Sequence, residues 1–237
     1  MLLACCRYCC EHSIRFLIVG KGSNCLFDDN GFDGCVILNR IEFIERIEPG
    51  VYRVGSGYPF NRLGLQCCNE GFSGLEFAGG IPGTVGGAAY MNAGANGQIV
   101  LPRYERLSSS SCRYIPSETF SVSEGATTGV LGKAEIISAS GERSAGSVFQ
   151  NPSGFSAAEF IEKAGLKGFR RGGAKVSEIH ANFFINCGSA TSTDMLELIN
   201  LVKVKVNSKF GIELKEEVKY VSACNGLISN RNDSFSV

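Results

Sequence analysis

The residues Gly20-Lys21-Gly22-Ser23-Asn24 come directly after the apolar run Phe16–Val19, a pattern typical of a short buried strand that ends in a tight turn. Glycine has no Cβ, so such a turn lets several backbone N–H groups approach one anion, such as a phosphate. The third glycine of the dinucleotide-binding fingerprint is replaced by Cys25, and the spacing of a Walker A loop does not occur. The pattern therefore indicates either another kind of phosphate-binding turn or an ordinary structural turn.

Residues 79–97 form a second glycine-rich block, in which small residues are interleaved with apolar ones. The block has no repeat period, so it is neither collagen-like nor a simple flexible linker. Two glycine-rich segments in one small chain could together surround a long ligand that carries a pyrophosphate. A tight structural loop is the alternative interpretation of the second block.

The elements expected around these loops are mixed α and β. The expected strands are Phe16–Val19, 35–38, 51–55 and 218–221, and the expected helices are 2–12 and 60–70. A further helix should begin after Ser156, which with Glu159 has the spacing of a capping box, and end at Gly165. The last helix should begin at Asp194 and end at Gly211, with an apolar stripe between them. Residues 102–129 are expected to form loops with at most short strands.

Composition excludes several classes of protein. The chain has 237 residues, 23 basic and 23 acidic, and 44% are hydrophobic, which argues against a largely disordered chain and against a strongly basic nucleic-acid-binding face. No apolar run reaches the ~18 residues of a membrane span. The 11 cysteines fit free thiols in a reducing cytosol. Cys6-x-x-Cys9 is best explained as small hydrophobic residues on a helix, with thiol redox chemistry as the lesser alternative, and no metal site is expected.

Four segments of the chain, in order, resemble the UDP-N-acetylenolpyruvoylglucosamine reductases. The matching segments are 16–24 with 31–37, 78–88 with 91–95, 144–152, and 210–218. The resemblance implies an α+β fold, with an FAD-binding domain of the vanillyl-alcohol-oxidase (PCMH-like) type over residues 1–145. A smaller α/β substrate-binding subdomain would occupy residues 146–225, and residues 226–237 would form a tail.

The resemblance also implies the reaction. FAD would be reduced by NADPH and would then pass a hydride to the enolpyruvyl double bond of a UDP-sugar, giving UDP-N-acetylmuramate for peptidoglycan and cell wall synthesis. A cytoplasmic monomer is expected, with no nucleic-acid or membrane partner. The residues expected to bind FAD are Gly20, Lys21, Gly22, Ser23, Asn24, Gly80, Ile81, Pro82, Gly83, Thr84, Gly86, Gly87, Ala88, Asn92 and Gly94.

Hydride addition to an enol ether builds negative charge toward the substrate carboxylate, and the other alkene carbon then needs a proton. By the resemblance, Ser147 gives that proton and Glu217 stabilises the enol form of the carboxyl group by a shared proton. The family spacing Leu-x-x-Glu-Val selects Glu217 over its neighbours Glu213 and Glu216. Without the resemblance, a serine in a Gly-Ser turn and a glutamate beside a strand would be ordinary turn and surface residues.

The substrate contacts are expected to come from an amide and from basic residues. Asn151 should contact the nucleotide sugar, because an amide both donates and accepts hydrogen bonds. Lys167, Arg170 and Arg171 could meet the diphosphate, or could form a solvated basic face. Arg113 is named as the residue that faces the substrate carboxylate, and the alternatives for this role are Arg103 and Arg106.

The chain departs from the family pattern in three places. We find no match to the strand and helix, with an Ile-Gly-Gly segment, that precede the first glycine loop in the family. The Tyr-Arg-x-Ser-x-Phe segment and the run before Gly141 also match poorly. A truncated or internally deleted copy, or a divergent working enzyme, would show these departures. The alternatives to the reductase are a non-catalytic or defective relative that keeps the fold, and a flavoprotein oxidoreductase with another substrate.

Overall fold

The computed structural model describes residues 2–95, 98–100, 104–105, 117–121, 123–124 and 144–224. The chain divides into two compact units. The first consists of Met1–Glu11, Phe16–Ser23 and Val36–Gly141, and the second of His12–Arg15, Asn24–Cys35 and Glu142–Val237. The second unit therefore includes an early segment that directly follows the first glycine loop.

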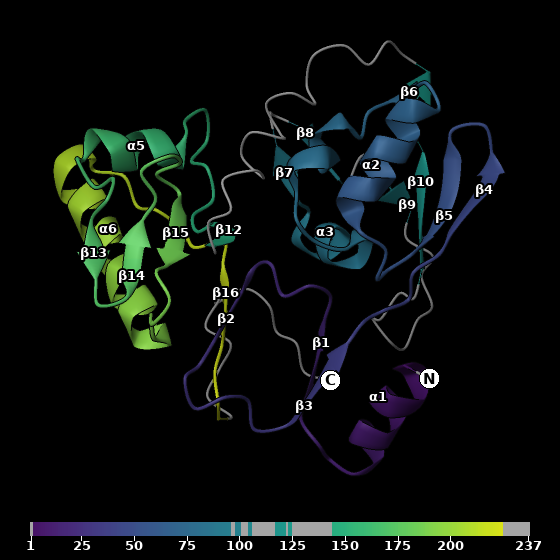
Figure 1. Ribbon diagram of the computed structural model, residues 1–237, viewed down its shortest axis with the longest axis horizontal. Helices are drawn as coiled ribbons and strands as arrows, with labels where there is room; N and C mark the ends of the chain where they lie inside the picture. Colours follow the sequence, from purple (N-terminus) through teal and green to yellow (C-terminus); the bar gives the residue numbers. More distant parts are fainter. Residues whose placement is uncertain are drawn as a thin grey trace. The chain divides into compact units, whose positions relative to one another are not determined.

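The first unit is built on an antiparallel sheet with the strand order β4-β5-β10-β9 (Figure 1). The strands are β4 (Ile44–Glu48), β5 (Val51–Gly55), β10 (Ser117–Ser121) and β9 (Tyr104–Glu105), and the helical elements are α2 (Phe60–Asn69), η1 (Glu76–Gly80) and α3 (Val85–Met91). Buried side chains from β5 and all three helical elements form one hydrophobic cluster, which includes Tyr52, Phe60, Phe77 and Val85. This cluster is the core that holds the second glycine block in place.

The remaining described elements of the first unit are a helix and three two-stranded pairs. They are α1 (Leu2–Glu11), the pair β1 (Phe16–Val19) and β3 (Cys35–Leu38), the pair β6 (Phe72–Ser73) and β11 (Ser123–Glu124), and the pair β7 (Gly94–Ala95) and β8 (Gln98–Ile99). The structure confirms the helices and strands expected between residues 2 and 70, and it adds β4 and α3, which the sequence patterns do not predict.

The second unit packs two helices with an antiparallel sheet of the order β12-β15-β14-β13 (Figure 1). Its elements are β12 (Ser144–Ser147), α5 (Ala157–Lys163), β13 (Arg170–Arg171), β14 (Ala174–Val176), β15 (Phe183–Asn186) and α6 (Ser192–Phe210). Two further strands, β2 (Cys25–Phe27) and β16 (Lys219–Val221), pair in parallel. Leu26 of β2 packs against the core of this unit, so the early segment Asn24–Cys35 is part of its fold.

The two helices predicted in the second unit, α5 and α6, are capped in different ways. α6 begins two residues before the expected Asp194, because Thr191 and Asp194 form a capping box, and it ends at Gly211 in the left-handed conformation (φ 70°). The capping box expected at Ser156 is wrong, since that side chain makes no capping hydrogen bond. The side chain of Asn151 accepts instead from the N–H of Ala157 at 3.0 Å, so the predicted helix α5 is confirmed with a different cap.

The described cysteines differ in exposure: Cys6, Cys9, Cys67 and Cys68 are buried, whereas Cys5, Cys10, Cys187 and Cys224 are exposed. Cys6 and Cys9 are the buried residues of α1, and no cysteine among the described residues forms a disulfide. Within the same residues, no helix combines the length and the apolar character that crossing a membrane requires.

Candidate active site

The two glycine-rich segments of the first unit lie against each other. A Cβ atom on Gly20 would lie only 2.3 Å from Oγ1 of Thr84, and one on Gly83 would lie 3.3 Å from Oγ of Ser23. The first distance is shorter than any real Cβ contact, so a side chain at position 20 would force the turn or the side chain of Thr84 to move. The turn after β1 and the turn before α3 are therefore in close contact, through the side chains of Thr84 and Ser23.

The turn before α3 is fixed by backbone hydrogen bonds to the segment that leads into α2. The N–H of Phe60 donates to the carbonyl of Gly83 at 3.1 Å, and the N–H of Val85 donates to the carbonyl of Tyr58 at 2.9 Å. Thr84 caps α3 by accepting from the N–H of Gly87 at 3.3 Å. These hydrogen bonds fix the backbone on either side of Thr84.

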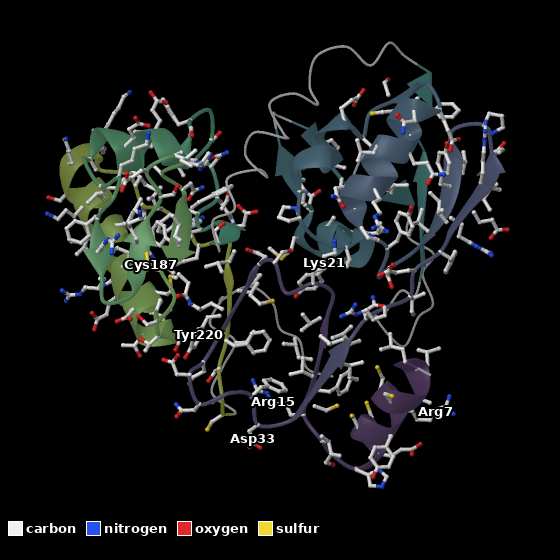
Figure 2. All side chains as sticks on the ribbon, viewed as in Figure 1. Arg7, Arg15, Lys21, Asp33, Cys187 and Tyr220 are labelled. Carbon is white, nitrogen blue, oxygen red and sulfur yellow. The ribbon has the colours of Figure 1, made fainter. Side chains whose placement is uncertain are left out.

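The residues present fit the diphosphate of a dinucleotide cofactor such as FAD. Gly22 adopts the left-handed conformation (φ 68°), which turns the backbone sharply between β1 and Ser23. Lys21, on the same turn, is exposed and adds a positive charge (Figure 2). Backbone donors and one cation beside a second glycine turn are the groups that bind phosphate oxygens.

Other residues expected to bind FAD have roles inside the fold. Ala88 is buried in the core of the first unit, and a Cβ on Gly86 would lie 2.9 Å from Cβ of Ser56. Asn92 ends α3 in the left-handed conformation (φ 47°). These residues position α3, and their contact with FAD remains a prediction, as it does for Gly80, Ile81, Pro82 and Gly94.

Asn24 belongs to the second unit, unlike the rest of its loop. Its side-chain nitrogen donates to the carbonyl oxygen of Glu217 at 3.1 Å, and its backbone oxygen accepts from the N–H of Lys219 at 3.0 Å. From the sequence, Asn24 is expected to bind FAD together with the rest of its loop. In the structure its amide supports the segment that carries Glu217.

Ser147 is presented by an irregularity in β12. Ser144 pairs with Ile185 and Ser147 pairs with Phe183, so three steps along β12 oppose two steps along β15. Gly146 takes up the extra residue in the left-handed conformation (φ 72°), which glycine adopts without strain. A bulge of this kind redirects the side chain that follows it, which here is Ser147.

Glu217 lies beside the loop that follows Ser147. The backbone N–H of Glu217 donates to the carbonyl oxygen of Val148 at 2.7 Å, and Glu216 forms an isolated antiparallel bridge with Phe149. The structure therefore brings together the segments of the two residues expected to carry the proton chemistry.

The three neighbouring glutamates have different environments. Burial raises the pKa of Glu217, which favours the protonated form. Glu216 forms an ion pair of 2.7 Å with Lys203 of α6, and Glu213 is exposed. The selection of Glu217 as the residue that shares a proton is thus consistent with its surroundings, because a protonated carboxyl can donate a hydrogen bond.

Most of the described residues expected to contact the substrate already have partners within the protein. Asn151 uses its side-chain oxygen to cap α5, so Nδ2 is the atom that could donate to a sugar. Lys167 pairs with Glu162 at 2.8 Å and Arg171 pairs with Glu197 at 2.8 Å, while Arg170 is exposed on β13. Arg113, Arg103 and Arg106 lie outside the described residues.

Asn182 is a polar residue that no sequence motif indicates. It is buried, and its side chain makes two hydrogen bonds to the backbone of Phe149, two residues after Ser147. The available signal was an asparagine in the otherwise apolar run Ala181-Asn182-Phe183-Phe184-Ile185. Across the described residues, no group of three or more His, Cys, Asp or Glu side chains could hold a metal ion.

Comparison with known proteins finds the same two parts in the same order. Residues 1–102 match the family described as "FAD binding domain", and residues 138–221 match the family described as "UDP-N-acetylenolpyruvoylglucosamine reductase, C-terminal domain". The chain is 42% identical to a UDP-N-acetylenolpyruvoylglucosamine reductase of Protochlamydia amoebophila, over 90% of this chain and 82% of the relative. It is 41% identical to that of Chlamydia trachomatis serovar L2, over 90% and 84%.

A solved structure has the same fold. The crystal structure of UDP-N-acetylenolpyruvylglucosamine reductase from Thermus caldophilus aligns with a TM-score of 0.69 and 27% identity, covering 88% of this chain and 86% of the other. The agreement extends over both units, and the relatives are matched over most of their own length. The chain thus belongs to the UDP-N-acetylenolpyruvoylglucosamine reductase family.

Proposed function

We propose that this chain reduces UDP-N-acetylglucosamine enolpyruvate to UDP-N-acetylmuramate, a step of peptidoglycan precursor synthesis, with FAD as its cofactor and NADPH as its reductant. Membership of the reductase family supports the proposal, because both the FAD-binding domain and the C-terminal domain match. The non-catalytic relative and the flavoprotein with another substrate are not favoured, since relatives that carry the reductase name match over more than four-fifths of their length.

The two adjoining glycine turns of the first unit would hold FAD. The backbone of Gly20–Ser23 and of residues 81–84 would face its diphosphate, with Lys21 adding a positive charge. With FAD held there, its flavin would supply the hydride chemistry of the reaction, with NADPH as the reductant.

The second unit would supply the remaining chemistry. When the alkene gains a hydride at one carbon, negative charge develops toward the substrate carboxylate, where a hydrogen-bond donor lowers its energy. Burial raises the pKa of Glu217, and in its protonated form this carboxyl would donate there. The hydroxyl of Ser147 would then transfer its proton to the other carbon and recover one from solvent. One hydride and one proton are added in all, and no group leaves.

The observation that carries this proposal is the hydrogen bond between the N–H of Glu217 and the carbonyl of Val148, next to Ser147. It joins the backbone of Glu217 to the residue that follows Ser147, and so links the two segments that carry the proposed functional groups. The bridge between Phe149 and Glu216 continues the same pairing, so adjacent residues hold the two segments together.

The test uses the full chain, purified and supplied with FAD. We expect a flavin absorption spectrum from the protein, and NADPH-dependent conversion of UDP-N-acetylglucosamine enolpyruvate to UDP-N-acetylmuramate, identified by mass spectrometry. A protein that binds no FAD, or one that binds FAD and forms no product, would contradict the proposal.

We further infer that the chain works as a monomer in the cytoplasm and takes a UDP-sugar, with no nucleic-acid or membrane partner. The absence of disulfides among the described cysteines supports a reducing compartment. Cell fractionation and sedimentation of the holoenzyme test this inference, and recovery in a membrane fraction or as a stable dimer would contradict it.

A further inference from the structure

Asn182 is a buried polar residue just before β15, and only 3% of its surface is exposed. Its side-chain oxygen Oδ1 accepts a hydrogen bond of 2.9 Å from the N–H of Phe149. Its side-chain nitrogen Nδ2 donates a hydrogen bond of 2.8 Å to the carbonyl oxygen of the same residue. One side chain therefore satisfies both backbone groups of Phe149, which lies in the loop after Ser147.

The amide of Asn182 extends the pairing of two strands by one residue. Phe183 of β15 opposes Ser147 of β12, and the N–H of Val148 donates to the backbone oxygen of Asn182 at 2.9 Å. The chain turns there, because the N–H of Phe183 bonds to the carbonyl of His180 at 2.9 Å. A side-chain amide carries a donor and an acceptor in one plane, as a peptide group does, so it can take the next place in the ladder.

The opposite edge of the same loop holds Glu217. The carbonyl of Val148 accepts from the N–H of Glu217 at 2.7 Å, and Phe149 is bridged to Glu216. The ring of Phe149 is buried and packs edge-on against that of Phe184, with 5.9 Å between the ring centroids. The backbone of residues 148–149 therefore has Asn182 on one side and the Glu217 segment on the other.

We propose that Asn182 is a positioning residue for the reduction of the substrate. By fixing the backbone of Phe149, its amide sets where the hydroxyl of Ser147 and the carboxyl of Glu217 lie relative to each other. The inference rests on the proposed function and deepens it, since it assigns a role to a residue that need not touch the substrate. Because a shift of about 1 Å at a reacting group can cost about 100-fold in rate, loss of this amide should slow the substrate step without preventing cofactor binding.

The test separates the two half-reactions in anaerobic stopped-flow experiments on the holoenzyme. Flavin reduction by NADPH is followed first, and oxidation of the reduced enzyme by UDP-N-acetylglucosamine enolpyruvate is followed second. Asn182→Leu is close in volume and removes both the donor and the acceptor. We expect the second rate constant to fall by about 10- to 100-fold and the first to stay within about twofold of wild type. A rate constant per bound flavin does not depend on how much protein is folded.

Asn186 provides a matched control on the same strand. Its side-chain oxygen accepts from the N–H groups of Gly188 at 2.8 Å and Ala190 at 3.1 Å, at the end of β15 away from Ser147. Asn186→Ala therefore also removes two hydrogen bonds to the backbone, but none that supports Phe149. Both half-reactions of this variant should keep the wild-type rate constants.

Asn182→Ser is the second variant, for the case that leucine prevents folding. The serine hydroxyl, with a water molecule in the space left by the smaller side chain, can hydrogen-bond to part of the Phe149 backbone. We therefore expect the rate constant for oxidation by substrate to fall less than in Asn182→Leu. The proposal is overturned if a folded Asn182 variant is oxidised by substrate at the wild-type rate, if both half-reactions slow equally, or if Asn186→Ala slows the substrate step as much. A wild-type enzyme that the substrate fails to oxidise contradicts the proposed function instead.

Discussion

The backbone N–H of Glu217 donates a hydrogen bond of 2.7 Å to the carbonyl oxygen of Val148, the residue after Ser147. Both residues belong to the second unit, so the bond lies within one compact body. The carbonyl of Glu217 in turn accepts from the side chain of Asn24 at 3.1 Å. Both backbone groups of Glu217 are thereby hydrogen-bonded, so the position of its backbone is fixed.

Glu217→Gln should change how stability depends on pH. The raised pKa means that the folded state binds the Glu217 proton more tightly than the unfolded state does. This residue's contribution to stability is therefore most favourable below the ordinary pKa of glutamate, and it declines as the pH rises through the raised value. Glutamine has no such loss, so the variant should gain stability relative to wild type as the pH increases.

Urea unfolding of the two proteins at a series of pH values measures this difference, and exposed Glu213→Gln is the matched control. A difference between Glu217→Gln and wild type that stays constant from acid to neutral pH would show that the carboxyl is not desolvated in the folded state.

Gly20→Ala should destabilise the first unit because the new Cβ would meet Oγ1 of Thr84 at 2.3 Å. Relieving this overlap requires the turn or Thr84 to move, at a cost of about 1–3 kcal/mol in the free energy of unfolding. The variant should also bind FAD more weakly, since the two glycine turns would separate.

A double-mutant cycle with Thr84→Gly isolates this contact, since glycine is tolerated at a helix N-cap with little loss. Gly20→Ala should cost markedly less in the Thr84→Gly background than in wild type. Equal costs in the two backgrounds would mean that the turns are not in contact.

Asp29→Ala should weaken the attachment of the early segment to the second unit. Its carboxylate oxygens accept from the backbone N–H of Ser192 at 2.8 and 3.0 Å and from the Ser192 hydroxyl at 2.9 Å, at the first turn of α6. A carboxylate at a helix N-terminus is favoured by the hydrogen bonds and by the helix dipole, so the free energy of unfolding should fall by about 1 kcal/mol.

Thermal unfolding of Asp29→Ala, beside that of exposed Asp33→Ala, measures this contribution (Asp33 is labelled in Figure 2). Asp33→Ala should leave the midpoint unchanged. Equal midpoints for the two variants would show that Asp29 contributes nothing measurable to the anchoring of α6.

The elements that could be predicted from the sequence are those with a local signal. α6 carries an apolar stripe and ends at Gly211, and both features are visible within the helix itself. α3 was missed because Gly86 and Gly87 lower its intrinsic helix propensity. It forms because Thr84 caps it and Val85, Ala88 and Ala89 are buried on one side, which are tertiary effects.

The sequence motifs predict the candidate catalytic residues, but they do not predict the residues that hold them in place. Ser147 and Glu217 stood out through resemblance, because each lies in a specific short pattern. The pairing of β2 with β16, and with it the contact of Asn24 with Glu217, joins residues from opposite ends of the sequence. No local sequence pattern encodes such a pairing. The role of Asn182 could not be predicted for the same reason, because its side chain bonds to the backbone of Phe149, 33 residues away in the sequence.

The substrate half-reaction of Ser147→Ala tests the central claim most directly. In single-turnover experiments, flavin reduction by NADPH should proceed as in wild type, because the serine serves only the later proton transfer. Oxidation of the reduced enzyme by UDP-N-acetylglucosamine enolpyruvate should slow by about 100- to 10,000-fold, the usual contribution of a general acid. Ser144→Ala, on the same strand, should behave as wild type. Oxidation of reduced Ser147→Ala at the wild-type rate would contradict the account.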